Sequence, residues 1–463
     1  MPVAVQRAMR AKVWSTAFSI VLLGCTHRGA APNLEAPPAR PARTIADDMA
    51  KTRRTSPPAA PPFSPTPLRA MWAITPPRLE GTFHVAAAPG SIYIAICREL
   101  DVLVERLDPR GALVWSAQIP GMCARFADGS SRPIAAATAD GIVVALPAMV
   151  DGLVGARVLR LDSAGDIAWE RRIRGEVRNL DVAATRGRIA ICFDHPTSTS
   201  FEGRPLPTSD GDGIALELDD HGARVGTYAA PATRCTYDEE SHLWMSGSGS
   251  AERVTGPRRH IVLWQANDSY EATAFETGWV VQQRDNLVFV DHDGARPWRI
   301  DWPAENSGCL VQPTPIAATA QRLLASVFFF CRPRGATMHF GDVTIQSEPG
   351  DAIVERVLVI DMDTVTMRTR AQFELEHPPK QMNRSMHYVP SSHGVLAYGH
   401  FQGSLGLGTN ITSGPPGYRC VTTLPRDAQT RGSYSTDAPF CNDGYRLRTD
   451  YPSWPVVALF PVP

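Results

Sequence analysis

Two short segments gather the oxygen ligands that calcium prefers. Ser209-Asp210-Gly211-Asp212-Gly213 and Asp291-His292-Asp293-Gly294 place carboxylates beside glycines, as calcium loops do. Neither segment has the spaced third acid or the distal Glu of an EF-hand loop. Both also coincide with turns that a repeated pattern in the chain explains. We therefore interpret them as turns, with calcium as the alternative, and predict no other cofactor.

Patterns typical of other catalytic or metal sites do not occur in the sequence. The twelve His residues include no HExxH motif and no His pair at metal spacing, and the nine cysteines form no CxxC. Gly247-Ser248-Gly249-Ser250 is a loop of small residues and not the strained Gly-x-Ser-x-Gly elbow of hydrolases. We therefore predict no catalytic, cofactor-binding or metal-binding residue.

The first residues carry a processing signal. Positive charges precede an apolar run at residues 13–23, which is shorter than the roughly 20 residues that a membrane-spanning helix needs. Leu22-Leu23-Gly24-Cys25 resembles a bacterial lipobox. The resemblance implies cleavage before Cys25 and lipid on its thiol, and Thr26 in place of Asp implies sorting to the outer membrane, on its periplasmic or surface side. An ordinary secretory signal or an uncleaved anchor is the alternative.

Eight further cysteines suggest disulfides, because their number is even and the chain is expected to be exported. We expect nearest neighbours along the chain to pair, with buried free thiols as the alternative. The candidate pairs are Cys97 with Cys123, Cys192 with Cys235, Cys309 with Cys331, and Cys420 with Cys441. Each pair closes a loop of about 20 to 45 residues, worth about 3–4 kcal/mol in the chain-entropy model.

Charge and composition limit the classes of partner and divide the chain. Lys+Arg 46 against Asp+Glu 47 gives a net charge of -1, so we predict no nucleic-acid binding. Pro and Ala dominate the region after Cys25, a composition that favours an extended, disordered tether. The expected organisation is a signal peptide at 1–24, a tether at 25–67 and a folded domain at 68–463.

The folded domain repeats itself. Residues 106–121, RLDPRGALVWSAQIPG, return at residues 160–175 as RLDSAGDIAWERRIRG. Each copy predicts a hairpin whose Asp-x-x-Gly turn uses the Asp side chain as an acceptor and Gly for positive φ, followed by a strand with a Trp. The residues of this pattern are Asp108, Gly111 and Trp115, then Asp162, Gly165 and Trp169, then Asp219 and Gly222, then Asp291, Gly294 and Trp298. We expect these tryptophans to pack one sheet against the next.

A second hairpin pattern recurs beside the first. It starts at Val85, Ile134, Val182, Ile316 and Tyr388, with the first starts 49 (134 − 85) and 48 (182 − 134) residues apart. Spacing of this size indicates a solenoid, a propeller or an array. Glycine-rich segments that begin at Phe201, Phe340 and Phe401 lie between the two hairpin types. Four antiparallel strands per unit predict a propeller blade.

These motifs resemble the SBBP-type β-propeller repeats of bacterial exported proteins and, more distantly, quinoprotein-type propeller repeats. The resemblance covers most of residues 81–431 and is weak at 231–303. The expected fold is an all-β propeller of about seven, six to eight, four-stranded antiparallel blades. The strand around Trp72 lacks partners nearby in the sequence, as does the final strand, so we expect the two to pair and close the ring.

A rigid ring that presents loops, without a catalytic pattern, favours binding over catalysis. We predict a non-catalytic, lipid-anchored binding or scaffolding module at the cell envelope, held to the membrane by lipid on Cys25, with an unknown protein or glycan partner. The alternative is a propeller enzyme, either a hydrolase or lyase or a quinone-type oxidoreductase, with a site at the central channel. Quinone-dependent dehydrogenases of the distant family carry adjacent cysteines, and this chain has no two cysteines adjacent. Titratable side chains from different blades meeting at the channel mouth would favour an enzyme.

Overall fold

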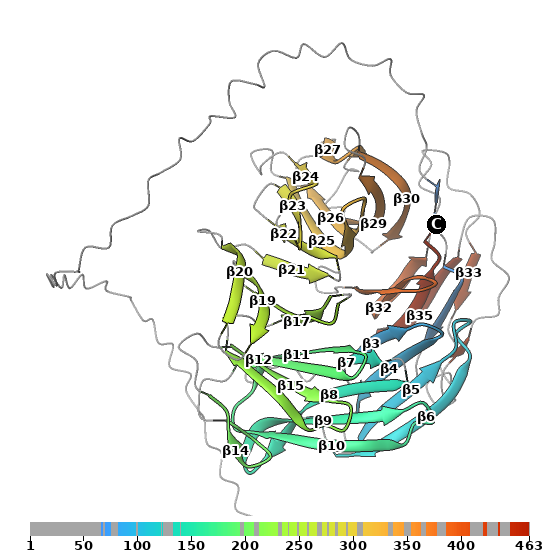
Figure 1. Cartoon of the computed structure of the whole chain (residues 1–463). Helices are drawn as coiled ribbons and strands as arrows, with labels where there is room; N and C mark the ends of the chain where they lie inside the picture. Colours follow the sequence, from blue (N-terminus) through green and yellow to red (C-terminus); the bar gives the residue numbers. More distant parts are fainter. Residues whose placement is uncertain are drawn as a thin grey trace, which may run out of the picture. The chain divides into compact units, whose positions relative to one another are not determined.

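The structure, a computed structural model, consists of antiparallel β-sheets that follow one another along the chain (Figure 1). It describes residues 66–462 except 68–69, 76–81, 99–100, 122, 124–132, 139, 195–198, 208–212, 230–233, 239, 248–249, 257–258, 266–270, 276, 283–285, 293–294, 303–308, 332–336, 347–352, 363–366, 377–385, 408–419, 424–433 and 436–444. In these residues no helix is long and apolar enough to cross a membrane. Cys25, the predicted signal peptide and most of the predicted tether lie outside them.

Seven four-stranded units make up the described sheets, and we name them blades A to G in chain order. Blade A contains β3 (Phe83–Ala88), β4 (Ser91–Cys97), β5 (Asp101–Leu107) and β6 (Leu113–Pro120). Blade B contains β7 (Ile134–Thr138), β8 (Gly141–Val150), β9 (Leu153–Asp162) and β10 (Ile167–Arg174). Blade C contains β11 (Arg178–Thr185), β12 (Arg188–Asp194), β15 (Gly213–Asp219) and β16 (Arg224–Ala229).

The remaining four blades complete the series. Blade D contains β17 (Arg234–Tyr237), β18 (Leu243–Gly247), β19 (Ser250–Gly256) and β20 (Arg259–Gln265). Blade E contains β21 (Glu271–Phe275), β22 (Gly278–Gln282), β23 (Asn286–Asp291) and β24 (Trp298–Asp301). Blade F contains β25 (Cys309–Thr319), β26 (Arg322–Cys331), β29 (Ile353–Met362) and β30 (Met367–Glu376). Blade G contains β31 (His387–Ser391), β32 (Gly394–Leu407), β35 (Tyr445–Phe460) and β2 (Trp72–Thr75).

The predicted propeller is confirmed, and its blades form a closed ring. The first strands of successive blades contact one another in the order β3, β7, β11, β17, β21, β25, β31 and back to β3. Strand β2 from the N-terminal side supplies the fourth strand of blade G, with Trp72 opposite Leu459 and Ile74 opposite Val457. Figure 1 accordingly shows blue strands beside red ones. The region with the weakest repeat pattern, residues 231–303, holds blades D and E.

Each interface between blades is an apolar layer, because the middle strands bury side chains on both faces. Every residue of β4, SIYIAIC, is buried. Ile92, Ile94 and Ile96 pack towards blade G, whereas Tyr93 and Ala95 pack towards blade B. A strand covered on both sides favours such a continuous apolar run over alternation. The repeated hairpins are therefore units that need their neighbours to bury a core.

Two of the three glycine-rich segments are hairpins inserted between the second and third strands of a blade, whereas the segment that begins at Phe401 continues β32 as far as Leu407. In blade C the insertion contains β13 (Ser200–Phe201) and β14 (Arg204–Pro205), and β13 pairs with β10 on the outer edge of blade B. In blade F it contains β27 (Thr337–Phe340) and β28 (Val343–Gln346), where Phe340 packs with Trp302. The short strands β1 (Thr66–Pro67), β33 (Cys420–Thr423) and β34 (Tyr434–Ser435) extend blades F and G.

The cysteines divide into a bonded pair, a free pair and residues with undescribed side chains. Cys97 and Cys123 form a disulfide with Cα atoms 5.8 Å apart, as nearest-neighbour order predicts. Cys192 and Cys235, the second expected pair, are instead buried free thiols. They pack in one apolar cluster between blades C and D, and Cys235 Sγ donates to the Ala190 carbonyl at 3.8 Å. Burial in an apolar layer stabilises a neutral thiol without a cross-link.

The other two expected pairs are described in part. The register of β25 and β26 places Cys309 opposite Cys331, a separation of Cα atoms within reach of a disulfide. Their side chains lie outside the described set, as does all of Cys441. Cys420 lies in β33. These two pairings stay predictions.

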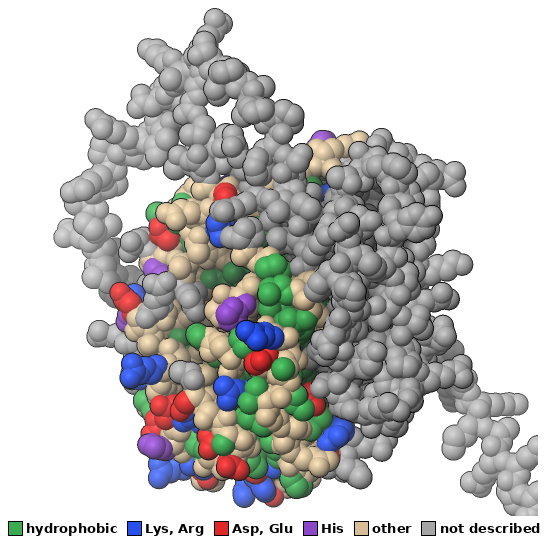
Figure 2. All heavy atoms as spheres, turned by 90° about the vertical axis from the view of Figure 1, so that its right-hand side faces the viewer, with side chains coloured by type: hydrophobic (Ala, Val, Ile, Leu, Met, Phe, Trp, Pro, Cys, Tyr) green, Lys and Arg blue, Asp and Glu red, His purple; other side chains and the backbone are tan. Residues whose placement is uncertain are grey.

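Charges of both signs share the surface. On the face drawn in Figure 2, Lys and Arg side chains are intermixed with Asp and Glu, and hydrophobic side chains gather beside them. The exposed large hydrophobic residues of the described chain include Leu113 and Val114 on β6, Ile167 on β10 and Val225 on β16. These four residues all lie on the fourth, outer strands of their blades.

Candidate functional site

The repeated Arg and Trp of blade A hold the turn of blade B. Arg106 on β5 and Trp115 on β6 lie opposite each other in the sheet. The Arg106 Nη1 and Trp115 Nε1 groups donate to one carbonyl, that of Ser163, at 2.9 and 2.8 Å. The Trp115 ring also covers Gly165, where a Cβ atom would lie 2.9 Å from the ring. We call this arrangement the Arg/Trp lock.

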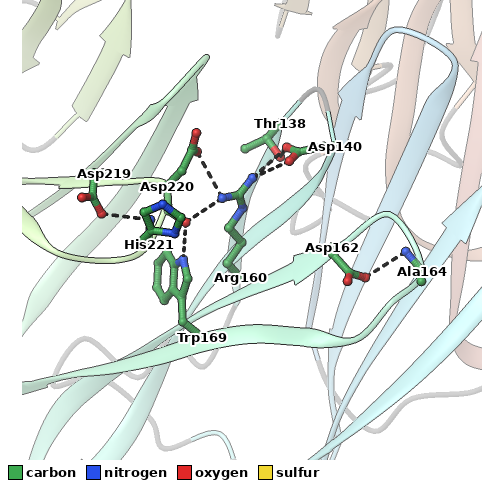
Figure 3. Close-up of polar contacts among 9 residues, drawn as sticks. All are labelled: Thr138, Asp140, Arg160, Asp162, Ala164, Trp169, Asp219, Asp220 and His221. Atoms are coloured by element: carbon green, nitrogen blue, oxygen red, sulfur yellow. Dashed lines mark hydrogen bonds and ion pairs between the residues drawn. The ribbon is translucent and has the colours of Figure 1, made fainter.

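Blade B repeats the Arg/Trp lock on blade C (Figure 3). Arg160 Nη1 and Trp169 Nε1 donate to the Asp220 carbonyl at 2.6 and 2.8 Å. Arg160 Nη2 also donates to both carboxylate oxygens of Asp140, each at 2.8 Å. Partial burial opposes ionisation of Asp140, but the Arg160 guanidinium outweighs it and lowers the pKa of this carboxyl. Arg160 therefore joins the first turn of its own blade to the next blade.

The Asp and Gly of the repeat build the turns on which the lock acts. The Asp side chains accept backbone N–H groups two and four residues ahead, as Asp162 does from Ala164 and Asp166 at 2.9 and 3.1 Å. Asp108, Asp219 and Asp291 cap their turns similarly. Gly111, Gly165 and Gly222 have positive φ. Asp, unlike most side chains, can cap such a turn locally.

The remaining residues singled out in the sequence lie as follows. Trp298 Nε1 donates to the Thr319 carbonyl of blade F at 2.9 Å, so this Trp also joins neighbouring blades. Gly294 and residues 209–212 lie outside the described residues. Asp291 caps its turn through Ala295, and no group of three or more His, Cys, Asp or Glu in the described chain could hold a metal ion.

Blade C breaks the pattern. The register pairs Glu217 with Gly226, in the positions that Arg106 and Trp115 occupy in blade A. Both donors of the Arg/Trp lock are therefore replaced where blade C faces blade D. The Tyr228 hydroxyl would clash with a Cβ atom at residue 226, so this tyrosine occupies space that a side chain at 226 would need.

Glu217 instead accepts three hydrogen bonds. Arg188 Nη1 and the Tyr237 hydroxyl donate to Oε1 at 2.9 and 3.1 Å, and the Tyr228 hydroxyl donates to Oε2 at 2.8 Å. Glu217 is only 3% exposed, and Tyr237 comes from blade D. A carboxylate removed from water is costly unless such donors satisfy it, so these three residues make its burial possible.

The surroundings fix the protonation of the donors. Burial, and then the hydrogen bond and charge of Glu217, raise the pKa of Tyr228 to about 12. Burial and the Glu217 charge also raise the pKa of Tyr237. The hydrogen bond and charge of Glu217 raise the pKa of Arg188. Both tyrosines consequently stay neutral donors, and Arg188 stays a cation.

A cavity of about 370 Å³ opens beside Glu217 between blades C and D, and we call it the C–D pocket. Arg188, Glu217 and Tyr228 line it from blade C; Glu240, Ser241, His242, Leu243 and Val254 line it from blade D. Its volume lies near the lower end of the range of small-molecule sites, about 300–1,000 Å³. The pocket is thus located where the Arg/Trp lock is missing.

A second buried acid holds the blade D wall of the C–D pocket. Asp238 Oδ1 accepts the His242 backbone N–H at 2.8 Å, and Oδ2 accepts Trp244 Nε1 at 2.9 Å and lies 3.1 Å from His242 Nδ1. Burial opposes ionisation of Asp238, but the bonds from Trp244 and His242 outweigh it and lower the pKa of this carboxyl. The turn that carries Ser241 and His242 is therefore fixed, and Ser241 has φ 64.

The site residues predicted from the sequence do not include Glu217, Arg188, Tyr228 or His242. One signal was visible in the repeat: the third copy has Glu-Leu-Asp at residues 217–219 where the first two have Arg-Leu-Asp. That charge reversal, together with Gly226 in place of the Trp, identifies blade C as a blade that cannot contact the next blade through the Arg/Trp lock.

No family model and no curated protein sequence matches the chain. The chain is similar to a structure of S. cerevisiae core factor at 9% identity and a TM-score of 0.37, over 85% of this chain and 61% of that one. It is also similar to the Dos1 propeller at 10% identity and 0.28, over 56% and 92%. An acylaminoacyl peptidase from Pyrococcus horikoshii matches at 8% and 0.33, over 80% and 64%. The chain thus spans under two thirds of the core factor and peptidase chains, and these likenesses carry no argument about function.

Proposed function

We propose that the protein is a non-catalytic propeller that binds a ligand in the C–D pocket, and that lipid on Cys25 anchors it at the cell envelope. The observation that supports binding is the pocket itself, located between blades C and D, where Glu217 and Gly226 replace both donors of the Arg/Trp lock. Propellers present such sites on a rigid frame, which keeps the cost of ordering a binding site low. The lipobox-like Leu22-Leu23-Gly24-Cys25 supports the anchor.

The chemistry of the C–D pocket favours binding over catalysis. Glu217 and Tyr237 are titratable groups from neighbouring blades in contact, which is a feature expected of an enzyme site. However, Glu217 already accepts three donors, so it is poorly placed to take a proton from a substrate. Tyr228, with its pKa raised to about 12, is a weak proton donor near neutral pH.

Photo-crosslinking in cells tests the binding site. A photoreactive amino acid at Glu240, which is exposed at the pocket, should give a cross-linked product that is lost when Arg188 is changed to Met. The same reagent at Arg204, exposed on β14 in blade B's sheet, is the control and should give no such product. Equal products at both positions, or none at Glu240, would refute ligand binding at the pocket.

Fractionation tests the anchor separately. The full chain should sediment with envelope membranes, whereas Cys25→Ala should not be lipidated and should lose the membrane association. Mass spectrometry of the purified chain should find a diacyl or triacyl group on an N-terminal Cys25. An unmodified Cys25, with both forms in the same fraction, would remove the anchor from the proposal and leave the pocket unaffected.

A further inference from the structure

The C–D pocket presents a hydrogen-bond acceptor and a donor side by side. A carboxylate has about four acceptor positions, and three donors occupy those of Glu217, which leaves one at Oε2. Arg188 uses Nη1 for Glu217 and is 47% exposed, so its other N–H groups can reach a ligand. A ligand that donates one hydrogen bond and accepts the next would satisfy both residues.

The charges at the base of the pocket already cancel. Arg188 and Glu217 form an ion pair of 2.9 Å, so neither charge is left to neutralise a charged ligand. At the rim, Glu240 Oε2 lies 3.4 Å from His242 Nδ1 and 3.8 Å from Arg253 Nη2. A charged ligand would be desolvated against an Arg188–Glu217 pair that carries no net charge, which is costly. The ligand class that fits is therefore neutral.

Two of the residues that line the pocket are apolar. Leu243 and Val254 line the pocket and are 4% and 8% exposed. A ligand that contacts them needs an apolar face as well as polar groups. A pyranose ring combines C–H groups on one face with hydroxyls around its edge, and each hydroxyl both donates and accepts.

We infer that the C–D pocket binds a neutral carbohydrate through two hydroxyls on adjacent carbon atoms, one donating to Glu217 and the next accepting from Arg188. This inference rests on the proposed binding function and names its ligand class. Arg188 and Glu217 are themselves hydrogen-bonded, Nη1 to Oε1 at 2.9 Å, so two neighbouring hydroxyls of one ligand can reach both side chains. The pocket volume of about 370 Å³ accommodates a small ligand.

The test measures carbohydrate binding by the full chain. An array with neutral, acidic and amino glycans and control peptides selects a probe, and calorimetry then gives the affinity of the best neutral oligosaccharide. Arg188→Met should weaken its binding about 10- to 100-fold, as expected for loss of a charged hydrogen bond. Arg322→Met is the matched control, because Arg322 also begins the second strand of its blade and pairs with an acid, Asp361. This variant should bind the oligosaccharide with an affinity within about twofold of wild type.

A second variant covers the case in which Arg188→Met does not fold. Tyr228→Phe removes one donor to Glu217 without removing the aromatic ring, and it should change affinity for the neutral oligosaccharide while the circular dichroism spectrum stays that of wild type. Binding only of acidic glycans or of peptides would overturn the ligand class, as would an affinity that neither variant changes.

The two proposals fail in different ways. A pocket-specific cross-link at Glu240 without binding of any neutral glycan would overturn the carbohydrate inference and keep the binding function. Absence of both the cross-link and glycan binding would overturn both proposals. Glycan binding that Arg188→Met abolishes, with Arg322→Met unchanged, would support both.

Discussion

Replacing Gly165 with Ala tests whether the Arg/Trp lock carries stability. Gly165 has φ 92, and a Cβ at this position would lie 2.9 Å from two atoms of the Trp115 ring. A non-glycine residue with this backbone costs about 1–2 kcal/mol. Overpacking against a fixed side chain adds about 1–3 kcal/mol. The sum predicts that Gly165→Ala lowers the free energy of unfolding by about 2–5 kcal/mol.

Trp115 cannot easily relieve this contact. Its Nε1 donates to the Ser163 carbonyl at 2.8 Å, so a shift of the ring lengthens that hydrogen bond. Removing the ring should relieve the clash. In a Trp115→Ala background, Gly165→Ala should therefore cost only the backbone term, about 1–2 kcal/mol.

Gly90→Ala is the control for the backbone term. Gly90 lies in the first turn of blade A with φ 75, and a Cβ there would have nothing within 4 Å. Urea unfolding followed by circular dichroism gives the free energies of unfolding of wild type, Gly165→Ala, Trp115→Ala, the double variant and Gly90→Ala. Equal losses for Gly165→Ala and Gly90→Ala, or an unchanged cost of Gly165→Ala without Trp115, would refute the role assigned to the lock.

Three further predictions concern the tyrosine, the thiols and the closing strand. Burial and then Glu217 raise the pKa of Tyr228 from 10.0 to about 12, so the hydroxyl proton is lost at lower pH in the unfolded chain than in the folded chain. The free energy of unfolding should therefore fall as pH rises from about 10 to 12, and it should fall less in Tyr228→Phe. Urea midpoints measured across this pH range test the prediction, and equal declines in both proteins would contradict it. Burial raises the pKa of the Cys192 and Cys235 thiols, so iodoacetamide at pH 8 should label neither residue in the folded chain. It should label both after unfolding without reductant. A peptide in which a disulfide joins Cys192 to Cys235 would disprove this prediction. Trp72→Ala should lower the free energy of unfolding by about 3–5 kcal/mol, because Trp72 is 6% exposed and donates to the Pro109 carbonyl at 2.9 Å. The control Met71→Ala changes an exposed side chain and should lower it by under about 0.5 kcal/mol. Similar urea midpoints for the two variants would argue against ring closure through β2.

The ring was predictable because its information is local and repeated. Asp162 and Gly165 specify a turn through contacts within five residues, and Trp169 follows at a fixed offset. The pairing of β2 with β35 was also predictable, since a strand without a nearby partner must find one to avoid an open edge. The free state of Cys192 and Cys235 was not, because sequence order does not report how the apolar layer between blades C and D packs two thiols.

The C–D pocket shows why a site is harder to predict than the fold that carries it. Glu217 is visible in the sequence as an exception to the repeat. This exception alone does not show whether other side chains fill the space beside it or leave a pocket there. The answer depends on Tyr237 and His242 from blade D, whose segment matches the repeat poorly. Had blade C kept Arg and Trp at 217 and 226, those side chains would reach for the next turn, as Arg160 and Trp169 do. Their replacement removes the contact that blades A and B make with the next blade, and the burial of Glu217 then needs the three donors Arg188, Tyr228 and Tyr237.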